Sequence, residues 1–241
     1  MGLNLTIDQG NSSAKIALWE GDCLVDQEVA AALSQELLAK VVDRFHPSRA
    51  LCCSVTGNGK RIAGWLETRG VKATEVNWQM PLPLKIDYAT PHTLGEDRIA
   101  AAVGAWSINP GENSLVVDMG TAVTYDLVSA DGHFRGGNIA PGIGMRLRSL
   151  NSFTARLPKV VGYGDTPLFG TDTETAMRAG AVRGVVSEIA YYRNSLPSGT
   201  RVVLTGGWAQ KVSEFLDFPV TLDKCLVTKG LLSILLYNEN K

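Results

Sequence analysis

The sequence predicts an α/β fold in which one unit of strands and helices occurs twice. Apolar runs of strand length alternate with longer segments of helical periodicity along the 241 residues, and such alternation is typical of α/β proteins. The motif Asp-x-Gly closes an apolar run at Asp8 and Gly10, and again 110 residues later at Asp118 and Gly120. In both places a second strand, a turn glycine and a third strand follow, which favours an internal duplication.

A turn-rich break separates the two copies, each with the predicted order βββ-α-β-α. The break is "NPGEN" at 109–113, because asparagine, proline and glycine end helices and form turns. We therefore expect an N-terminal subdomain at 1–112 and a C-terminal subdomain at 113–241, with the last helix packing back on the first subdomain.

In the first half, apolar residues recur at every fourth position from Val29 to Phe45 and predict a helix over 28–45. A second helix, over 94–108, is predicted to end at the break. The other elements expected here are strands at 2–8, 13–21 and 49–55, a short helix at 59–70, and an irregular, proline-containing stretch at 72–93.

In the second half, a strand triplet beginning near residue 114 repeats the opening of the chain. The run "GGNIAPGIGMR" at 136–146 is interpreted as a loop that approaches a ligand closely, because glycine lacks a side chain. The remaining elements expected are a helix at 174–194, the strand "RVVLTGG" at 201–207, a helix from about 208 and an apolar helix at 228–238.

Composition excludes several classes of protein. The net charge is −1 and the basic residues are scattered, so no nucleic-acid partner is expected. No apolar run reaches 18 residues and no leader pattern is present, so we expect no membrane association and a cytoplasmic protein. The four cysteines lack metal-ligand spacing.

The first Asp-x-Gly copy combines groups that hold phosphate. Backbone N–H groups of a glycine turn and a lysine bind anions, and Asp8 can hold Mg²⁺ because hard cations prefer oxygen ligands. An ordinary hairpin turn uses the same residue types, so this is the alternative. Two such turns, with Gly-rich segments after them, favour nucleotide binding, and we expect the two carboxylates to face each other across a cleft.

Two other segments carry groups suited to the same chemistry. Asp97 and Arg98 stand at a helix start, where a carboxylate can accept the proton of a substrate hydroxyl and an arginine can clamp an oxygen. Helix capping by Glu96 and Asp97 is the alternative, because acidic residues suit a first turn. Gly206 and Gly207 separate a strand from a helix, which permits close approach of an anionic ligand.

These motifs, in this order, resemble type III pantothenate kinase, a family of the acetate and sugar kinase/Hsp70/actin superfamily. The resemblance covers nearly the whole chain. The matching patterns are Asp8-x-Gly10-Asn11-Ser12-x-x-Lys15, Leu94-Gly95-x-Asp97-Arg98, Asp118-x-Gly120-Thr121-Ala122-x-Thr124, Gly136-Gly137-x-Ile139-x-Pro141-Gly142, Leu157-Pro158, Gly170-x-x-Thr173-x-x-Ala176-Met177 and Thr205-Gly206-Gly207.

The resemblance implies a duplicated RNase H-like (actin-like ATPase) fold flanking an ATP cleft. It also implies ATP-dependent phosphorylation of pantothenate to 4'-phosphopantothenate, the first step of coenzyme A biosynthesis, by a homodimer that needs Mg²⁺ and a monovalent cation, K⁺ or NH₄⁺. Asp97 would be the catalytic base, and Asp118 would bind the monovalent cation. Residues implied for ATP are Asp8, Gln9, Gly10, Asn11, Ser12, Ser13, Ala14, Lys15 and Thr121, with Asp8 also on Mg²⁺. Residues implied for pantothenate are Tyr88, Gly95, Glu96, Asp97, Arg98 and Thr173.

The chain departs from the family pattern at a few positions. Ser12 replaces a threonine, Thr90 replaces an asparagine before a proline, and Gln9 stands where an apolar residue is expected. The residues alone give no role to Gln9. Two alternatives remain for the function: another small-molecule kinase of the superfamily, or a non-catalytic ATP-binding regulator with the same fold.

Overall fold

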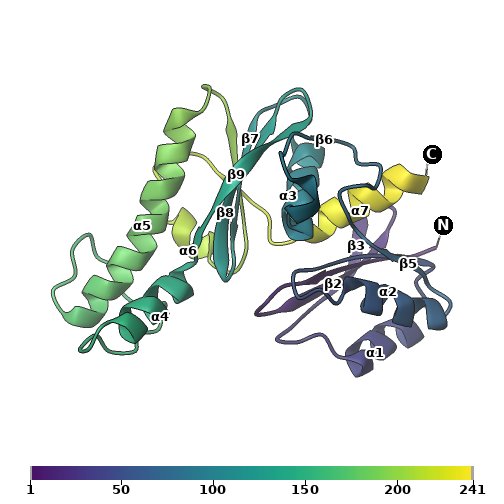
Figure 1. Ribbon diagram of the computed structural model, residues 1–241, viewed down its shortest axis with the longest axis horizontal. Helices are drawn as coiled ribbons and strands as arrows, with labels where there is room; N and C mark the ends of the chain where they lie inside the picture. The colour runs from purple at the N-terminus through teal and green to yellow at the C-terminus, as the bar shows by residue number, and fades with distance from the viewer. Residues whose placement is uncertain (1, 240–241) are drawn as a thin grey trace. The chain divides into compact units, whose positions relative to one another are not determined.

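The computed structural model describes residues 2–239, which fold as two compact units (Figure 1). The first unit comprises the chain up to Gly111, the segment Val128–Arg135 and the chain from Cys225 onward. The second unit comprises Glu112–Leu127 and Gly136–Lys224. The first unit is therefore discontinuous in sequence.

The first unit is built on a five-stranded sheet with the order β3-β2-β1-β4-β5. β1 pairs antiparallel with β2 and parallel with β4. The elements of this unit are β1 (Asn4–Gln9), β2 (Ala14–Glu20), β3 (Cys23–Ala30), α1 (Gln35–Phe45), β4 (Arg49–Ser54), α2 (Gly59–Thr68), β5 (Lys72–Glu75), β6 (Lys85–Ile86), the 3₁₀ turn η1 (Pro91–Thr93), α3 (Glu96–Ile108) and α7 (Leu226–Glu239).

Helices cover both faces of this sheet, and side chains of its inner strands are therefore buried on both sides. Leu5 and Ile7 of β1 pack with buried residues of α1 and α2. On the opposite face, Trp19 of β2 packs against Leu232 of α7 and donates its indole N–H to Thr6 Oγ1 at 2.8 Å. Burial on two faces is what places β1, and the turn that follows it, at a fixed position in the unit.

The helices α3 and α7 pack through glycines. A Cβ on Gly230 would overlap the Ala100 carbonyl, and a Cβ on Gly104 would overlap the Leu226 carbonyl. The two backbones can approach so closely only because these positions lack side chains. The apolar character of α7 reflects this burial, and none of the helices described over residues 2–239 is long and apolar enough to cross a membrane.

The second unit has five strands in the order β11-β10-β7-β8-β9, and β10 runs parallel to β7 and β11. Residues of α4, α5 and α6 form one core with the inner strands. Its elements are β7 (Ser114–Met119), β8 (Ala122–Ser129), β9 (His133–Pro141), α4 (Ile143–Phe153), α5 (Thr173–Ser195), β10 (Arg201–Thr205), α6 (Ala209–Ser213) and β11 (Thr221–Leu222). The tip of the β8–β9 hairpin belongs to the first unit, where His133 and Phe134 pair in parallel with β6.

The prediction of a helix over 28–45 is wrong in its first seven residues. The strand β3 continues to Ala30, and Val29 lies in it with 62% of its surface exposed. The helix begins at Gln35, because the Ser34 side chain accepts a hydrogen bond from the Leu37 N–H and caps it. The four-residue spacing is therefore a helical signal only from Leu37 onward.

The interpretation of 136–146 as a loop is also wrong. β9 extends to Pro141, and α4 begins at Ile143. Gly142 connects them, and a Cβ there would overlap the Thr121 carbonyl. Gly142 is a glycine because of close packing and not because the chain forms a loop there. The helix that follows has buried apolar residues at helical spacing, Ile143 and Leu147.

Candidate active site

The first Asp-x-Gly motif forms a four-residue turn between β1 and β2. Asp8 lies opposite Lys15, and Gln9 lies opposite Ala14. The Gly10 N–H donates to the Ser13 carbonyl at 2.9 Å and closes the turn. The segment from Asp8 to Lys15 thus places a carboxylate and an ammonium group on paired positions at one end of the sheet.

Gln9, for which the sequence alone gave no role, holds the next segment of the chain. Its side-chain oxygen Oε1 accepts hydrogen bonds from Ser54 Oγ at 2.7 Å and Thr56 Oγ1 at 3.1 Å. Ser54 Oγ also accepts from the Asn58 N–H at 3.2 Å, just before α2. The amide therefore ties the end of β1 to the loop between β4 and α2. The parallel pairing of β1 with β4, which a single sequence does not reveal, is what brings these residues together.

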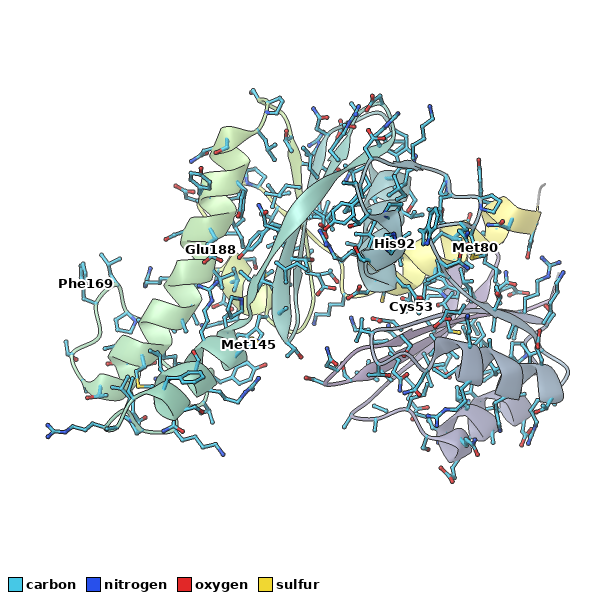
Figure 2. The ribbon with its side chains drawn as sticks, viewed as in Figure 1. Cys53, Met80, His92, Met145, Phe169 and Glu188 are labelled. Atoms are coloured by element: carbon cyan, nitrogen blue, oxygen red, sulfur yellow. The ribbon has the colours of Figure 1, made fainter. Side chains whose placement is uncertain are left out.

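The first turn of α3 brings two more carboxyl groups to this region. Glu96 Oε2 accepts from the Ser54 N–H at 3.3 Å, and Asp97 Oδ1 accepts from the Arg98 N–H at 2.9 Å. A Cβ on Gly95 would lie 2.5 Å from Asp97 Oδ1, so a glycine is needed for this carboxylate orientation. Cys53 of β4 (Figure 2) donates its thiol to Asp8 Oδ1 at 3.5 Å.

Desolvation controls the electrostatics of these carboxyls. Burial raises the pKa of Asp8, the Lys15 charge opposes that rise, and the neighbouring Asp97 adds to it. Burial also raises the pKa of Asp97, against the hydrogen bond from the Arg98 N–H. The pKa of Glu96 is raised to about 7, chiefly by burial. Asp8 and Asp97 therefore interact in a region of low dielectric, where a positive charge or a proton is favoured.

Arg98 and Tyr88 are brought together beside this group. The Arg98 side chain is buried, with its guanidinium 5.7 Å from the centre of the Tyr88 ring and 5.6 Å from that of Phe134. Tyr88 meets Phe134 edge to face, with ring centres 6.0 Å apart. The aromatic faces fix the guanidinium plane by cation–π attraction. The predicted pantothenate residues Tyr88, Gly95, Glu96, Asp97 and Arg98 thus lie in one unit.

The second motif forms a tighter turn in the second unit. Asp118 lies opposite Thr205 on the parallel strands β7 and β10, and the Gly120 N–H donates to the Ala122 carbonyl at 3.0 Å. Gly206 has a φ of +88°, and a Cβ there would lie 2.6 Å from Asp118 Oδ1. The glycine after β10 therefore keeps the space over the Asp118 carboxylate open.

The other predicted residues of the second unit are on separate elements. Thr121 follows Gly120 in the turn, and its carbonyl accepts from the Gly142 N–H at 3.1 Å. Thr173 is the first residue of α5, directly after Asp172, which caps that helix by accepting from the Thr175 N–H. The second unit thus presents Asp118 and Thr121 together, and Thr173 at the start of its long helix.

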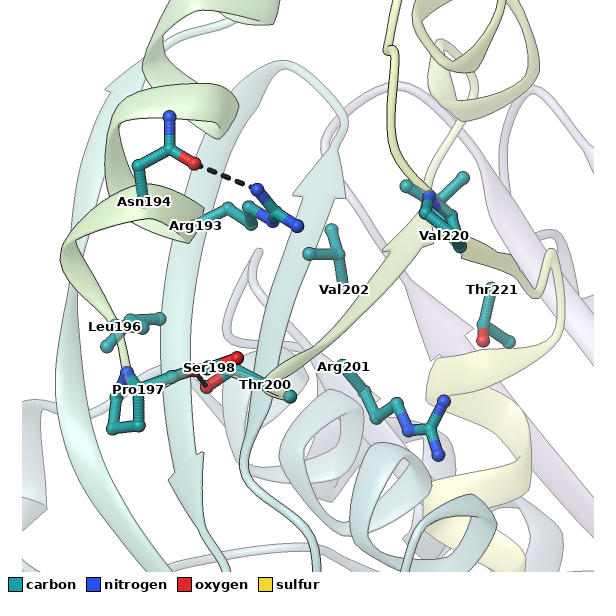
Figure 3. A pocket seen from close by; sticks show the side chains of 12 residues that line it. Arg193, Asn194, Leu196, Pro197, Ser198, Thr200, Arg201, Val202, Val220 and Thr221 are labelled. Atoms are coloured by element: carbon teal, nitrogen blue, oxygen red, sulfur yellow. Dashed lines mark hydrogen bonds between the residues drawn. The ribbon is translucent and has the colours of Figure 1, made fainter.

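A hollow of about 440 Å³ lies at the other end of the second unit's sheet (Figure 3). Arg201, which lines it, begins β10 and lies opposite Ser114 at the start of β7, whereas Asp118 and Thr205 lie at the carboxyl ends of the same strands. Arg193, also in the lining, donates to Asn194 Oδ1 at 3.0 Å. In parallel sheets ligands bind at the carboxyl ends, so this hollow is not the site assembled above.

The donor set suits a magnesium ion that is completed by phosphate. Among residues 2–239, no group of three or more His, Cys, Asp or Glu side chains could form a metal site of its own. Mg²⁺ in phosphoryl-transfer sites is held by one or two carboxylates together with phosphate oxygens and waters. Asp8, desolvated and near Asp97, meets that requirement.

The two α/β units, each with an Asp-x-Gly turn at the end of its first strand, have the fold of several solved structures. A conserved putative Baf family transcriptional activator from Campylobacter jejuni is similar in structure, with a TM-score of 0.68 and 23% identity over 98% of this chain and 100% of that chain. The activator of 2-hydroxyisocaproyl-CoA dehydratase from Clostridium difficile with bound ADPNP is similar, with a TM-score of 0.59 and 10% identity over 99% and 96%. The predicted fold class is confirmed.

The sequence comparisons identify the family. The family model of type III pantothenate kinase matches residues 4–194. The type III pantothenate kinase of Phocaeicola vulgatus is 40% identical over 240 residues, covering 98% of this chain and 99% of that protein. The chain belongs to the type III pantothenate kinase family, which confirms the resemblance found in the sequence. The protein is therefore an ATP-dependent kinase by family.

Proposed function

We propose that this protein transfers the γ-phosphate of ATP to the hydroxyl of pantothenate, giving 4'-phosphopantothenate for coenzyme A biosynthesis. Family membership supports the substrate pair. The structural observation that carries the proposal is the pair of desolvated carboxyls, Asp8 and Asp97, one beside a lysine and the other at a helix start. Phosphoryl transfer needs a base and neutralised phosphate charge, and little other covalent chemistry.

Asp97 is the general base of this proposal. Its carboxylate accepts the proton of the pantothenate hydroxyl while that oxygen bonds to the γ-phosphorus and the bond to the β-phosphate oxygen breaks, releasing ADP. Its raised pKa makes the carboxylate a better proton acceptor than an exposed aspartate. The hydrogen bond from the Arg98 N–H orients the carboxylate.

The turn from Asp8 to Lys15 holds the ATP phosphates. Lys15 and the backbone N–H groups of Asn11, Ser12 and Ser13 neutralise phosphate charge. Asp8 holds Mg²⁺, which when bound withdraws charge from the phosphate oxygens. The chain's own contribution is alignment of the phosphates with the substrate hydroxyl, which accounts for a large share of such rate enhancements.

The remaining predicted residues complete the two substrate sites. Tyr88, Gly95, Arg98 and Thr173 bind pantothenate, with Arg98 held by the two rings that face it. Asp118 binds K⁺ or NH₄⁺, and Thr121 contacts ATP. The space that Gly206 leaves over the Asp118 carboxylate supports this assignment.

We further propose a cytoplasmic homodimer. The second unit exposes several large apolar side chains, with Phe153 87%, Phe169 81%, Leu168 69% and Tyr191 67% exposed. Phe169, labelled in Figure 2, lies in the segment before α5. Large apolar side chains that are exposed can mark protein–protein contact, and Phe169 lies four residues before Thr173. Sedimentation equilibrium gives the test, because a monomer at micromolar concentration would overturn the dimer.

The activity test uses the purified chain with ATP, Mg²⁺ and pantothenate, in potassium or in sodium. Mass spectrometry should detect 4'-phosphopantothenate, with more product in potassium. Asp97→Asn should lower kcat by roughly 10²–10⁴-fold, the usual worth of a general base. The matched control is Asp217→Asn, at an exposed aspartate of the second unit, which should retain the wild-type rate.

The outcomes separate the alternatives. ATP binding without any product would support a non-catalytic regulator, and phosphorylation of a sugar instead of pantothenate would support another kinase of the superfamily. A rate for Asp97→Asn equal to that of wild type would keep the kinase and remove Asp97 as its base.

A further inference from the structure

We propose that Gln9 is a positioning residue: its side-chain oxygen, acting through Ser54, fixes the Asp8–Lys15 turn relative to the first turn of α3. The inference rests on the proposed function, in which that turn holds phosphate and α3 carries the base. It assigns to Gln9 a task other than contact with ATP.

The side-chain oxygen of Gln9 is hydrogen-bonded within the protein. Its Oε1 accepts from both Ser54 Oγ, at 2.7 Å, and Thr56 Oγ1, at 3.1 Å. The backbone adds a third link, because the Val55 N–H donates to the Gln9 carbonyl at 3.1 Å. The loop after β4 is therefore attached to the residue immediately before the turn glycine.

Ser54 extends this attachment to the helix of the base. Its hydroxyl is bonded to Gln9, while its backbone N–H donates to Glu96 Oε2 at 3.3 Å. Ser54 is 6% exposed, so water competes little for these bonds. One residue thus joins the end of β1 to the residue that precedes Asp97.

The charges of the region explain why the acceptor is an amide. Asp97 is close enough to both Asp8 and Glu96 to raise the pKa of each, so the region already holds three carboxyl groups. A glutamate at position 9 would add a fourth negative charge. An apolar residue would leave the Ser54 and Thr56 hydroxyls without this acceptor. Glutamine supplies the acceptor and adds no charge.

Positioning matters here because the reaction depends on alignment. A misplacement of about 1 Å can cost up to roughly 10²-fold in rate. Asp8 is adjacent to Gln9, so a looser Gln9 changes where Asp8 and the turn lie relative to Asp97. Each neutral hydrogen bond is worth about 1 kcal/mol, so losing two of them allows roughly thirtyfold more of the misaligned turn, at about 1.4 kcal/mol for each factor of ten.

The test is a double-mutant cycle with Gln9→Met and Ser54→Ala. Methionine keeps the length of the side chain and removes the acceptor. Gln9→Met loses both bonds to its side-chain oxygen and should lower kcat/KM for ATP by up to roughly thirtyfold, whereas Ser54→Ala loses one of them and should lower it by about fivefold. The double variant should be no slower than Gln9→Met alone, because the bond between Gln9 and Ser54 can be lost only once. Gln35→Met, at an exposed residue of α1, is the matched control and should behave as wild type.

Amide hydrogen exchange of the segment 9–15, followed without substrates, tests the positioning apart from the chemistry. Exchange should be faster in Gln9→Met and unchanged in Gln35→Met. Unchanged exchange together with unchanged kinetics would overturn the inference, as would single effects that multiply in the double variant. If the wild type makes no phosphopantothenate, the proposed function fails, and faster exchange in Gln9→Met alone still supports the positioning role.

Discussion

The two Asp-x-Gly turns begin alike and differ in what surrounds them. The turn after β1 has four residues and pairs Asp8 with Lys15, and the loop after the parallel neighbour β4 is bonded to Gln9. The turn after β7 has two residues, Gly120 and Thr121. β10 is the parallel neighbour of β7, and the residue that follows β10, Gly206, has a left-handed backbone conformation.

The difference is consistent with the separate tasks proposed above for the two turns. A longer turn with a lysine offers several N–H donors and a positive charge, which suits a chain of phosphates. At the two-residue turn, Gly206 leaves the space over a single carboxylate, Asp118, open, which suits a small cation. The same strand arrangement can therefore hold an anion in one half and a cation in the other.

The largest expected effect comes from exchanging each carboxylate for its amide. Asp8→Asn should lower kcat/KM for Mg-ATP by roughly 10²-fold or more at every potassium concentration, because a charge that faces the metal is lost. Asp118→Asn should instead raise the half-saturating potassium concentration by about tenfold, the worth of one charge-assisted contact. Steady-state kinetics at varied potassium separates the two.

Equal behaviour of the two variants would contradict the division of tasks. In particular, recovery of Asp8→Asn in high potassium would place the monovalent cation in the first unit. Measurement of nucleotide binding without potassium gives the control, because Asp118→Asn should bind an ATP analogue more strongly than Asp8→Asn does.

A smaller effect, on stability, is expected from alanine at the glycines of the two turns. Gly206→Ala forces an L-residue into a φ of +88° and places its Cβ 2.6 Å from Asp118 Oδ1. The free energy of unfolding should fall by about 2 kcal/mol or more. Gly10 is outside the left-handed region, and its Cβ would lie 3.2 Å from the Ser13 carbonyl. Gly10→Ala should cost less than about 1 kcal/mol, as urea denaturation can measure.

The smallest expected effect is a pH dependence at Glu96, in the first turn of α3. Burial, Glu75 on β5 and Asp97 raise the pKa of Glu96 to about 7, against Lys60 of α2 and the Ser54 N–H. The folded state thus binds a proton more tightly than the unfolded state, so this stability contribution falls as pH rises from about 4.5 to about 7.

Glu96→Gln removes this contribution. The variant should gain stability relative to wild type between pH 5 and pH 8, by on the order of 1 kcal/mol, since the side chain is half exposed and solvent screens it. Urea denaturation at the two pH values measures it. A constant difference between the two proteins would show that Glu96 does not titrate in this range.

Much of the fold could be predicted from the sequence because its signals are local. The paired Asp-x-Gly motifs, the alternation of strands and helices, and the family motifs require only short-range patterns. The end of β3 is mispredicted because Val29 coincides with a helical spacing, and α4 is not predicted because Gly142 is required by the close approach of the Thr121 carbonyl. That carbonyl is distant in sequence, so no local pattern reveals the constraint.

The candidate site shows the same limit. Asp8, Asp97 and Asp118 were chosen from motifs, and their roles remain predictions. The task of Gln9 could not be read from its neighbours in sequence, because its partners, Ser54 and Thr56, are on a different strand and loop. The parallel pairing of β1 with β4 had to be known first.

The packing of α3 against α7 has a consequence for the order in which the protein folds during synthesis. The residues of α7 leave the ribosome after the whole of the second unit, yet α7 covers β1 and meets the α3 backbone at Gly104 and Gly230. The first unit is therefore translated first and completed last. Until α7 arrives, Ala17 and Trp19 lack the leucines that cover them, and apolar surface that is exposed in this way makes a nascent chain prone to aggregation.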